Sequence, residues 1–231
     1  MVDRFLDAYK TLERVLEEKY REAPRHFNSL VMEYLNDPES EPYREDMDLC
    51  REVRNLLVHR ADMQGEPPIM PSQALIAKIE EIVAYATNPP LAISVATPAE
   101  QLVTTHPGQR TLTVMHKMTQ SGYSHIPVLD YGKFVGIFSV STLFSFAKEY
   151  PERGIGQNSR IGDFLQWLDI DSHCTERFCF MPQNVGLFTA RHAFETVGSD
   201  KKRLAMILLT KTGKPNEEIL GVLTPWDVMK K

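Results

Sequence analysis

Two short apolar stretches, YSHIPVLD at Tyr123–Asp130 and KFVGIFS at Lys133–Ser139, decide how this chain folds. Both are rich in the β-branched and aromatic residues that favour strands, and Tyr131 and Gly132 between them favour a tight turn. The stretch before them, 113–121, has helical spacing. The region therefore predicts a helix followed by a β-hairpin.

The same pattern returns near the end of the chain. RLAMILLT at Arg203–Thr210 and ILGVLT at Ile219–Thr224 form a second strand pair, again preceded by a helical stretch at 186–197. The chain thus repeats a β-α-β-β-α unit of about 60 residues. One such unit leaves a face of its small sheet uncovered, so we expect the two units to pack against each other.

The first 88 residues show the period of amphipathic helices instead. Breaks at 36–38 and 65–68, and two prolines after Asn88, delimit four helices with short connections, which is typical of an antiparallel bundle. The apolar positions of the four helices are Phe5, Tyr9, Leu12, Leu16 and Tyr20; Phe27, Leu30, Val31, Tyr34 and Leu35; Met47, Cys50, Val53, Leu56 and Leu57; and Leu75, Ile76, Ile79, Ile82 and Val83. We therefore expect an α+β protein, with a helical bundle at 1–88 and a module at 89–231 whose repeats span about 94–150 and 158–231.

Composition narrows the functional classes. The formal net charge is −5 and 42% of the residues are apolar, so we expect a soluble globular protein without an overall positive field for nucleic acid. No run of about 18 apolar residues could span a membrane, and the N-terminus does not resemble a signal peptide. Three unevenly spaced cysteines favour a reducing compartment over a disulfide framework. These features predict a cytoplasmic protein that does not bind membranes.

The two units differ just after their last strands. Aligning GVLTPWD with GIFSVST places Thr224 on Ser139 and Asp227 on Thr142. A hydroxyl residue at a helix start lies where an anion is favoured, and a carboxylate one turn later can accept hydrogen bonds from two ribose hydroxyls. Thr142 offers only a single hydroxyl. The TPWD stretch is also a sound helix start, so capping alone is the alternative.

These stretches resemble a known family. GYSHIPVLD, Gly122–Asp130, resembles the signature of cystathionine-β-synthase (CBS) domains, and GVLTPWD resembles the threonine and aspartate that close such domains. The resemblance runs from near Ser94 to the C-terminus and implies a tandem CBS pair, or Bateman module. Such pairs are usually dimeric and bind adenine nucleotides or adenosyl compounds in clefts between the repeats. In this family the strand with the proline lines the adenine pocket, the threonine meets phosphate and the aspartate accepts hydrogen bonds from ribose.

On this resemblance we assign the residues of the two repeats to separate clefts. The preferred nucleotide site is the Asp227 cleft, where the cations of 201–203 would favour a phosphorylated ligand. The Ser124 cleft is expected to be weaker or empty, and a merely solvated 201–203 loop is the alternative. The Asp227 cleft is assigned Met181, Pro182, Arg203, Leu204, Ala205, Thr224 and Asp227, and the Ser124 cleft is assigned Tyr123, Ser124, His125, Ile126, Pro127 and Ser139.

The helical part holds another candidate site in REVRNLLVHR. Arg54 and His59 are separated by four residues, with Asn55 beside the arginine, which resembles the Arg-x4-His signature of HEPN domains between roughly Phe5 and Tyr85. That resemblance implies a metal-independent ribonuclease, in which histidine would act as acid or base and arginine would stabilise phosphorane charge. Residues five apart on an ideal helix lie about 140° apart, so the pair requires the helix to end near His59 or a second subunit to complete the site. The alternative is structural, with Arg54 paired to an acid and His59 ending the helix.

The sequence therefore predicts a homodimeric regulatory protein. It is expected to bind AMP, ATP, a cyclic dinucleotide or S-adenosylmethionine in its CBS clefts and to signal through the helical domain. A nucleotide-gated ribonuclease using Arg54 and His59 is one alternative, the only one with RNA as a partner, and a scaffold with closed clefts is another. No metal is expected, because His173, Cys174 and Cys179 lack the paired spacing of zinc ligands.

Overall fold

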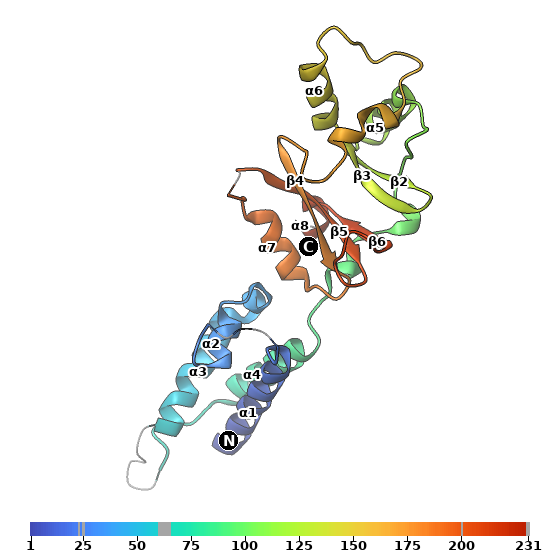
Figure 1. The fold of residues 1–231 in the computed structure, drawn as a ribbon. Helices are drawn as coiled ribbons and strands as arrows, with labels where there is room; N and C mark the ends of the chain where they lie inside the picture. The colour runs from blue at the N-terminus through green and yellow to red at the C-terminus, as the bar shows by residue number, and fades with distance from the viewer. Residues whose placement is uncertain (23, 25, 60–65, 200, 230–231) are drawn as a thin grey trace. The chain divides into compact units, whose positions relative to one another are not determined.

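The structure, a computed structural model, describes residues 1–22, 24, 26–59, 66–199 and 201–229. The chain divides into two compact units, Met1–Pro90 and Leu91–Lys231. The sequence predicted this boundary two residues earlier, after residue 88. The first unit is helical and the second combines helices with strands (Figure 1). Gly65, in the expected break before the fourth helix, and Arg60, the last residue of REVRNLLVHR, lie outside the described residues.

Among its described residues, the first unit contains four α-helices. They are α1 (Val2–Lys19), α2 (Leu30–Leu35), α3 (Arg44–His59) and α4 (Gln73–Thr87), with a 3-10 helix, η1 (Pro38–Tyr43), between α2 and α3. α1 packs against each of the other three, and the apolar stripes meet in one core that includes the fully buried Phe5, Tyr34 and Ile79. The shared core explains why these short helices are stable together, since isolated helices of this length are marginal in water.

The second helix is shorter than the apolar spacing from Phe27 to Leu35 predicts. Ser29 has an extended backbone, so α2 begins only at Leu30. The Glu33 carboxylate accepts hydrogen bonds from the backbone N–H groups of His26 and Phe27, at 2.8 and 2.9 Å, and holds this segment outside the helix. The Phe27 side chain is accordingly exposed.

The second unit contains the repeat. The first copy comprises α5 (Thr111–Ser121), β2 (His125–Asp130), β3 (Lys133–Ser139) and α6 (Val140–Glu149). The second copy comprises β4 (Glu176–Pro182), α7 (Leu187–Glu195), β5 (Arg203–Thr210), β6 (Ile219–Leu223) and α8 (Pro225–Met229). In the first copy the opening strand is reduced to Thr105, which bridges Val128 of β2 in parallel, as β4 pairs with β5 in parallel. Both hairpins, β2–β3 and β5–β6, lie where the apolar pattern predicts them.

The segment that precedes each copy packs on the hairpin of the other copy. Strand β1 (Thr97–Pro98), ahead of the first copy, pairs with β6 and completes a four-stranded sheet in the order β1-β6-β5-β4. Leu168, ahead of the second copy, accepts a hydrogen bond from the Ile137 N–H of β3 at 2.7 Å. A side chain at Gly136 would meet the Leu168 carbonyl oxygen at 2.1 Å, and one at the aligned Gly221 would meet the Thr97 oxygen at 3.2 Å. Gly136 and Gly221 therefore leave room for the segments at Leu168 and Thr97, each of which precedes one copy and packs on the hairpin of the other. We call these two the exchanged segments.

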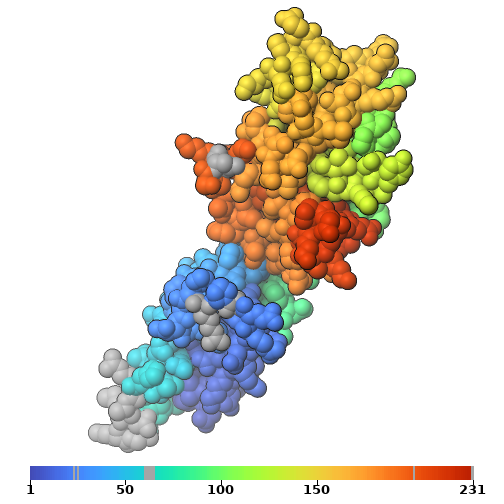
Figure 2. Space-filling view, in the orientation of Figure 1, coloured from blue at the N-terminus to red at the C-terminus, as the bar shows by residue number. Residues whose placement is uncertain are grey.

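The two hairpins also pack on each other through side chains. Ile137 of β3 is fully buried in a cluster with Met206, Leu208 and Val222 of the second copy. The rings of Phe134 and Phe180 meet edge to face, with centroids 5.2 Å apart, a favourable aromatic geometry. On the face shown in Figure 2, the yellow-green hairpin of the first copy adjoins red residues of the second. This contact brings the start of β2 close to the end of β6.

Candidate functional site

The second unit has a pocket of about 410 Å³ between the start of β2 and the end of β6. Its walls come from both copies of the repeat, with Met206 and Val222 of the β5–β6 hairpin between them. Two aromatic side chains at the pocket are solvent-accessible, Tyr123 at 50% and Trp226 at 74%. The expected site residues that line it are Tyr123, Ser124, His125, Pro127, Thr224 and Asp227.

This arrangement differs from the division into two clefts that the sequence suggested. Gly122, Ser124 and Pro127, which belong to the first copy, line the same pocket as Thr224 and Asp227 of the second copy. The physical reason is the packing of the two hairpins, which sets the end of β6 beside the start of β2. Each copy therefore contributes part of the lining of a single pocket.

Thr224 and Asp227 are tied to each other as well as lining the pocket. Asp227 Oδ2 accepts hydrogen bonds from the Thr224 backbone N–H at 2.8 Å and from the Thr224 hydroxyl at 2.7 Å. An acid that reaches back to the N-cap residue in this way stabilises a helix start. Asp227 thus caps the helix and lines the pocket at the same time, and the capping hydrogen bonds fix the direction of its carboxylate.

The other residues assigned to the Asp227 cleft lie away from this pocket. Pro182 ends β4, and Arg203, the first residue of β5, is exposed. Met181 and Leu204 pack with α7 and β6 in one core, while Ala205 packs in the core between the hairpins. In the pairing of β4 with β5, Arg177 is opposite Leu204 and Phe178 opposite Met206, so Ala205 is the extra residue of a bulge. A bulge shifts the alternation of a strand, and here Met206 lines the pocket.

Ile126 and Ser139, assigned to the Ser124 cleft, are buried. Ile126 packs in the core of the first copy. The Ser139 hydroxyl accepts from the backbone N–H groups of Ser141 and Thr142, at 3.1 and 3.3 Å, and so caps α6. The same hydroxyl donates to Glu176 Oε1 at 2.7 Å. A carboxylate of the protein therefore lies where a ligand phosphate was expected.

Glu176 is the centre of a polar cluster that the sequence reasoning missed. His125 Nε2 lies 2.8 Å from one carboxylate oxygen, and His173 Nδ1 lies 3.4 Å from the other. Burial alone would raise the pKa of the Glu176 carboxyl, but hydrogen bonds from His125, His173 and Ser139 outweigh burial and hold the pKa well below its usual range. The only sequence signal was an isolated acid at the start of the apolar stretch ERFCFMP.

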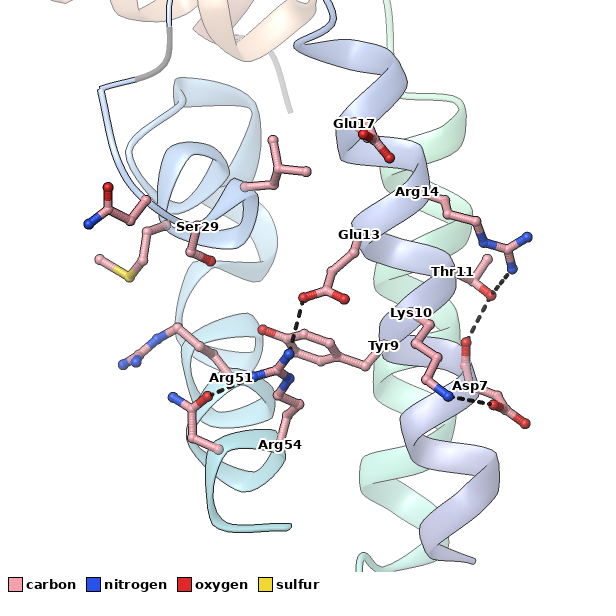
Figure 3. Close-up of a pocket in the computed structure, with 14 residues that line it drawn as sticks. Asp7, Tyr9, Lys10, Thr11, Glu13, Arg14, Glu17, Ser29, Arg51 and Arg54 are labelled. Carbon is pink, nitrogen blue, oxygen red and sulfur yellow. Dashed lines mark hydrogen bonds and ion pairs between the residues drawn. The ribbon is translucent and has the colours of Figure 1, made fainter. Parts of the chain in front are cut away.

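The candidate site of the first unit lies at the C-terminal end of α3 (Figure 3). Arg54 Nη1 is 3.4 Å from His59 Nε2, because α3 ends at His59 and its last side chain can turn back. Glu13 of α1 forms an ion pair with Arg54 at 3.6 Å, and the guanidinium lies over the Tyr9 ring, 5.5 Å from its centroid. Arg54 is therefore close to His59 and is also paired with an acid.

Arg54 also borders an open pocket of about 870 Å³ between α1, α3 and the segment 28–32. Figure 3 shows Glu13 and Tyr9 projecting from α1 toward Arg54 across this hollow. Asn55 lines it too, with Oδ1 3.4 Å from Arg54 Nη1, whereas His59 is exposed and does not line it. Burial and the nearby Glu13 raise the pKa of Tyr9 to about 12. The pocket therefore combines cationic and acidic side chains with a tyrosine that stays neutral.

Within the part of the chain that the structure describes, no group of three or more His, Cys, Asp or Glu side chains has an arrangement that could hold a metal ion. No helix of the same residues is long and apolar enough to cross a bilayer.

Comparison with known proteins identifies part of the chain. The family model described as the CBS domain matches residues 84–149, which include the whole first copy of the repeat, so the chain contains a CBS domain. No curated protein matches the chain.

Several solved structures are similar at low sequence identity. CBSX2 from Arabidopsis thaliana in complex with AMP is 14% identical, with a TM-score of 0.41 over 60% of this chain and 93% of that one. The CBS domain of a bacterial CNNM/CorC family Mg²⁺ transporter in complex with ATP is 15% identical, with a TM-score of 0.41 over 61% and 84%. CbpB in complex with c-di-AMP is 13% identical, with a TM-score of 0.43 over 60% and 81%.

Proposed function

We propose that the second unit is a regulatory module that binds an adenine nucleotide or a related adenosyl compound in the pocket between β2 and β6. The observation that carries this proposal is that one pocket is lined by residues of both copies: Tyr123, Ser124, His125 and Pro127 of the first, and Thr224, Trp226 and Asp227 of the second. The CBS-domain match over residues 84–149 supports the same reading. A volume of about 410 Å³ lies within the usual range for small-molecule sites.

The chemistry of the walls suits the parts of a nucleotide. Tyr123 and Trp226 offer exposed aromatic surface for an adenine base. Asp227 supplies a carboxylate for the ribose hydroxyls, with its position held by Thr224. Ser124 and His125 place polar groups at the opposite wall for a phosphate. In this proposal the ligand joins the two copies and changes how the helical units of a homodimer meet.

The test is a calorimetric titration with AMP, ATP, c-di-AMP and S-adenosylmethionine. Asp227→Asn removes the charge but keeps an oxygen for the Thr224 N–H, so the helix cap is largely preserved. We expect the affinity to fall about tenfold or more in this variant, the cost of losing a charge-assisted hydrogen bond. Asp130→Asn, the same change at an exposed position outside the pocket, is the matched control and should bind as the wild type does. Equal binding by wild type and Asp227→Asn would contradict the proposed role of Asp227.

A second candidate function rests on the contact between Arg54 and His59. The 3.4 Å separation of Nη1 and Nε2 would let a cation and a proton-transfer group act on one RNA phosphate. Cleavage of mixed RNA should then be lost in His59→Ala and be unchanged in His26→Ala, a control at an exposed histidine of the same unit. Equal cleavage by wild type and His59→Ala would exclude this enzyme. If the protein neither cleaves RNA nor binds any of the four ligands, the scaffold alternative stands.

A further inference from the structure

We infer that His125 makes the pocket selective for a phosphorylated ligand, by taking up a proton when an anionic group binds beside it. The inference rests on the proposed nucleotide site and specifies which end of the ligand is read by which side chain. It starts from the position of the imidazole ring, whose two nitrogens face different environments.

His125 connects the pocket to the buried acid behind it. Its Nδ1 lies 2.8 Å from the hydroxyl oxygen of Ser124, an exposed residue that lines the pocket. Its Nε2 lies 2.8 Å from Glu176 Oε2 on β4. The ring also packs edge to face on Phe178, with centroids 5.4 Å apart. The His125 side chain is 17% exposed and the Glu176 side chain 16%, so the pair is largely shielded from solvent.

Glu176 decides which nitrogen of the neutral His125 ring carries the hydrogen. An ionised carboxylate only accepts hydrogen bonds, so the one N–H of a neutral His125 is on Nε2 and donates to Glu176. Nδ1 must then accept the hydroxyl hydrogen of Ser124. In this state neither Nδ1 nor the Ser124 hydroxyl offers a hydrogen to a ligand.

Protonation of His125 reverses the bond to Ser124. Nδ1 then carries a hydrogen and donates it to the Ser124 oxygen, which frees the hydroxyl hydrogen for an acceptor in the pocket. The ring also gains a positive charge at the pocket wall. A phosphate oxygen benefits from both changes, whereas the ribose and adenine of an unphosphorylated nucleoside gain little from them.

Several titratable and charged groups surround the His125 ring. Glu176 faces Nε2 from β4, and His173 and Ser139 hold the same carboxylate from the other side. Asp227 of α8 lines the pocket that Ser124 borders. Of the nearby cations, the Lys202 ammonium donates to the His173 carbonyl oxygen, and Arg203 is exposed at the strand position opposite Glu176. A phosphate beside Ser124 would add a negative charge to those of Glu176 and Asp227, so phosphate binding and protonation of the ring favour each other.

The experiment compares AMP with adenosine, which lacks the phosphate. Calorimetric titrations of the full chain run from about pH 5.5 to about pH 8, in buffers of different ionisation enthalpy, so that proton uptake is measured with affinity. Because the phosphate itself gains charge over this range, the reference is His125→Gln, in which the phosphate still titrates but residue 125 does not. His116→Gln, at an exposed position of α5, is the matched control.

We expect the AMP affinity of the wild type to fall about tenfold relative to His125→Gln as the pH rises, while adenosine affinity stays level in both. AMP should drive more proton uptake in the wild type and in His116→Gln than in His125→Gln, and the difference measures the proton on His125. The imidazole NMR signals of His125 in the wild type give the same answer without a substitution, because AMP and not adenosine should shift them toward the protonated form.

Other outcomes would contradict either the role of His125 or the proposed nucleotide site. If AMP and adenosine bind equally, or if the pH profile of AMP is the same in His125→Gln, the role of His125 is wrong and the nucleotide site stands. If His125 stays neutral in the AMP complex by NMR, the role of His125 is also wrong. If neither ligand nor any other of the adenine panel binds, the proposed function fails, and the inference fails with it.

Discussion

The hydroxyl of Ser139 donates a hydrogen bond to Glu176 over 2.7 Å, and this contact distinguishes two positions that the repeat makes equivalent in sequence. At the end of the first copy, the hydroxyl residue is buried and satisfied by an acid of the protein itself. At the end of the second copy, Thr224 and Asp227 border a pocket. Asp227 therefore lines a pocket, whereas the corresponding Thr142 is buried and completes a helix cap with Ser139.

Trp226 should report ligand binding by its fluorescence. It is one of two tryptophans in the chain, and it is 74% exposed at the pocket, whereas Trp167 is 8% exposed in an aromatic cluster with Phe146. A base that stacks on Trp226 should quench its emission and leave the Trp167 emission unchanged. Titration with AMP is therefore expected to quench the wild type and to have no effect on Trp226→Phe. A quench that persists in Trp226→Phe would show that the base does not stack on Trp226.

Glu176→Gln should lower the stability of the second unit in a pH-dependent way. The pKa of Glu176 is held below its usual range, so its stabilising effect is present above the unfolded value of about 4.3 and is lost as the pH falls through the folded value. We expect the wild type to be more stable than Glu176→Gln by about 1–3 kcal/mol near neutral pH. This difference should shrink below about pH 4. Urea unfolding followed by Trp167 fluorescence measures it.

The control for that series is Glu152→Gln at an exposed loop position. It should unfold as the wild type does at every pH. A stability difference between wild type and Glu176→Gln that stayed constant down to strongly acidic pH would contradict an ionised Glu176 in the folded protein.

Gly136→Ala should be far more disruptive than Gly132→Ala. A methyl group at residue 136 would lie 2.1 Å from the Leu168 carbonyl oxygen, so the exchanged segment must move. Residue 132 has a positive φ of 80° but nothing within 4 Å of the added carbon. We expect a loss of about 3 kcal/mol or more for Gly136→Ala and about 1–2 kcal/mol for Gly132→Ala. If urea unfolding gave equal losses of stability for the two variants, the segment at Leu168 would move aside at little cost in free energy.

Only one of the three cysteines should react rapidly with a thiol reagent in the folded protein. Cys174 is exposed, whereas burial raises the pKa of Cys50 to about 12 and that of Cys179 to about 11. The thiolate is the reactive form, so the thiols of the buried Cys50 and the half-buried Cys179 should react slowly near neutral pH. Colorimetric titration should give a single fast thiol that Cys174→Ser removes and three fast thiols in urea. A fast phase that survives in Cys174→Ser would place a second thiol at the surface.

The local patterns predicted the elements well where they were regular. Apolar alternation and turn residues located β2–β3 and β5–β6, because a hairpin depends on neighbours in sequence. Helical spacing located α1, α3 and α4 for the same reason. It failed for α2, where the Glu33 carboxylate binds the backbone ahead of the helix and delays its start to Leu30. Nothing in the spacing of apolar residues reveals such a contact.

The sequence by itself determined the repeat, the matching Gly136 and Gly221, and the loss of the acid at Thr142, because these are properties of neighbouring residues. Only the tertiary structure decided that Asp227 lines the same pocket as Ser124, that the bulge at Ala205 puts Met206 there, and that Glu176 fills the position beside Ser139. Each of these depends on how two distant hairpins pack and on which side chains the packing brings within hydrogen-bond reach. Such contacts join residues far apart along the chain, and no local pattern records them.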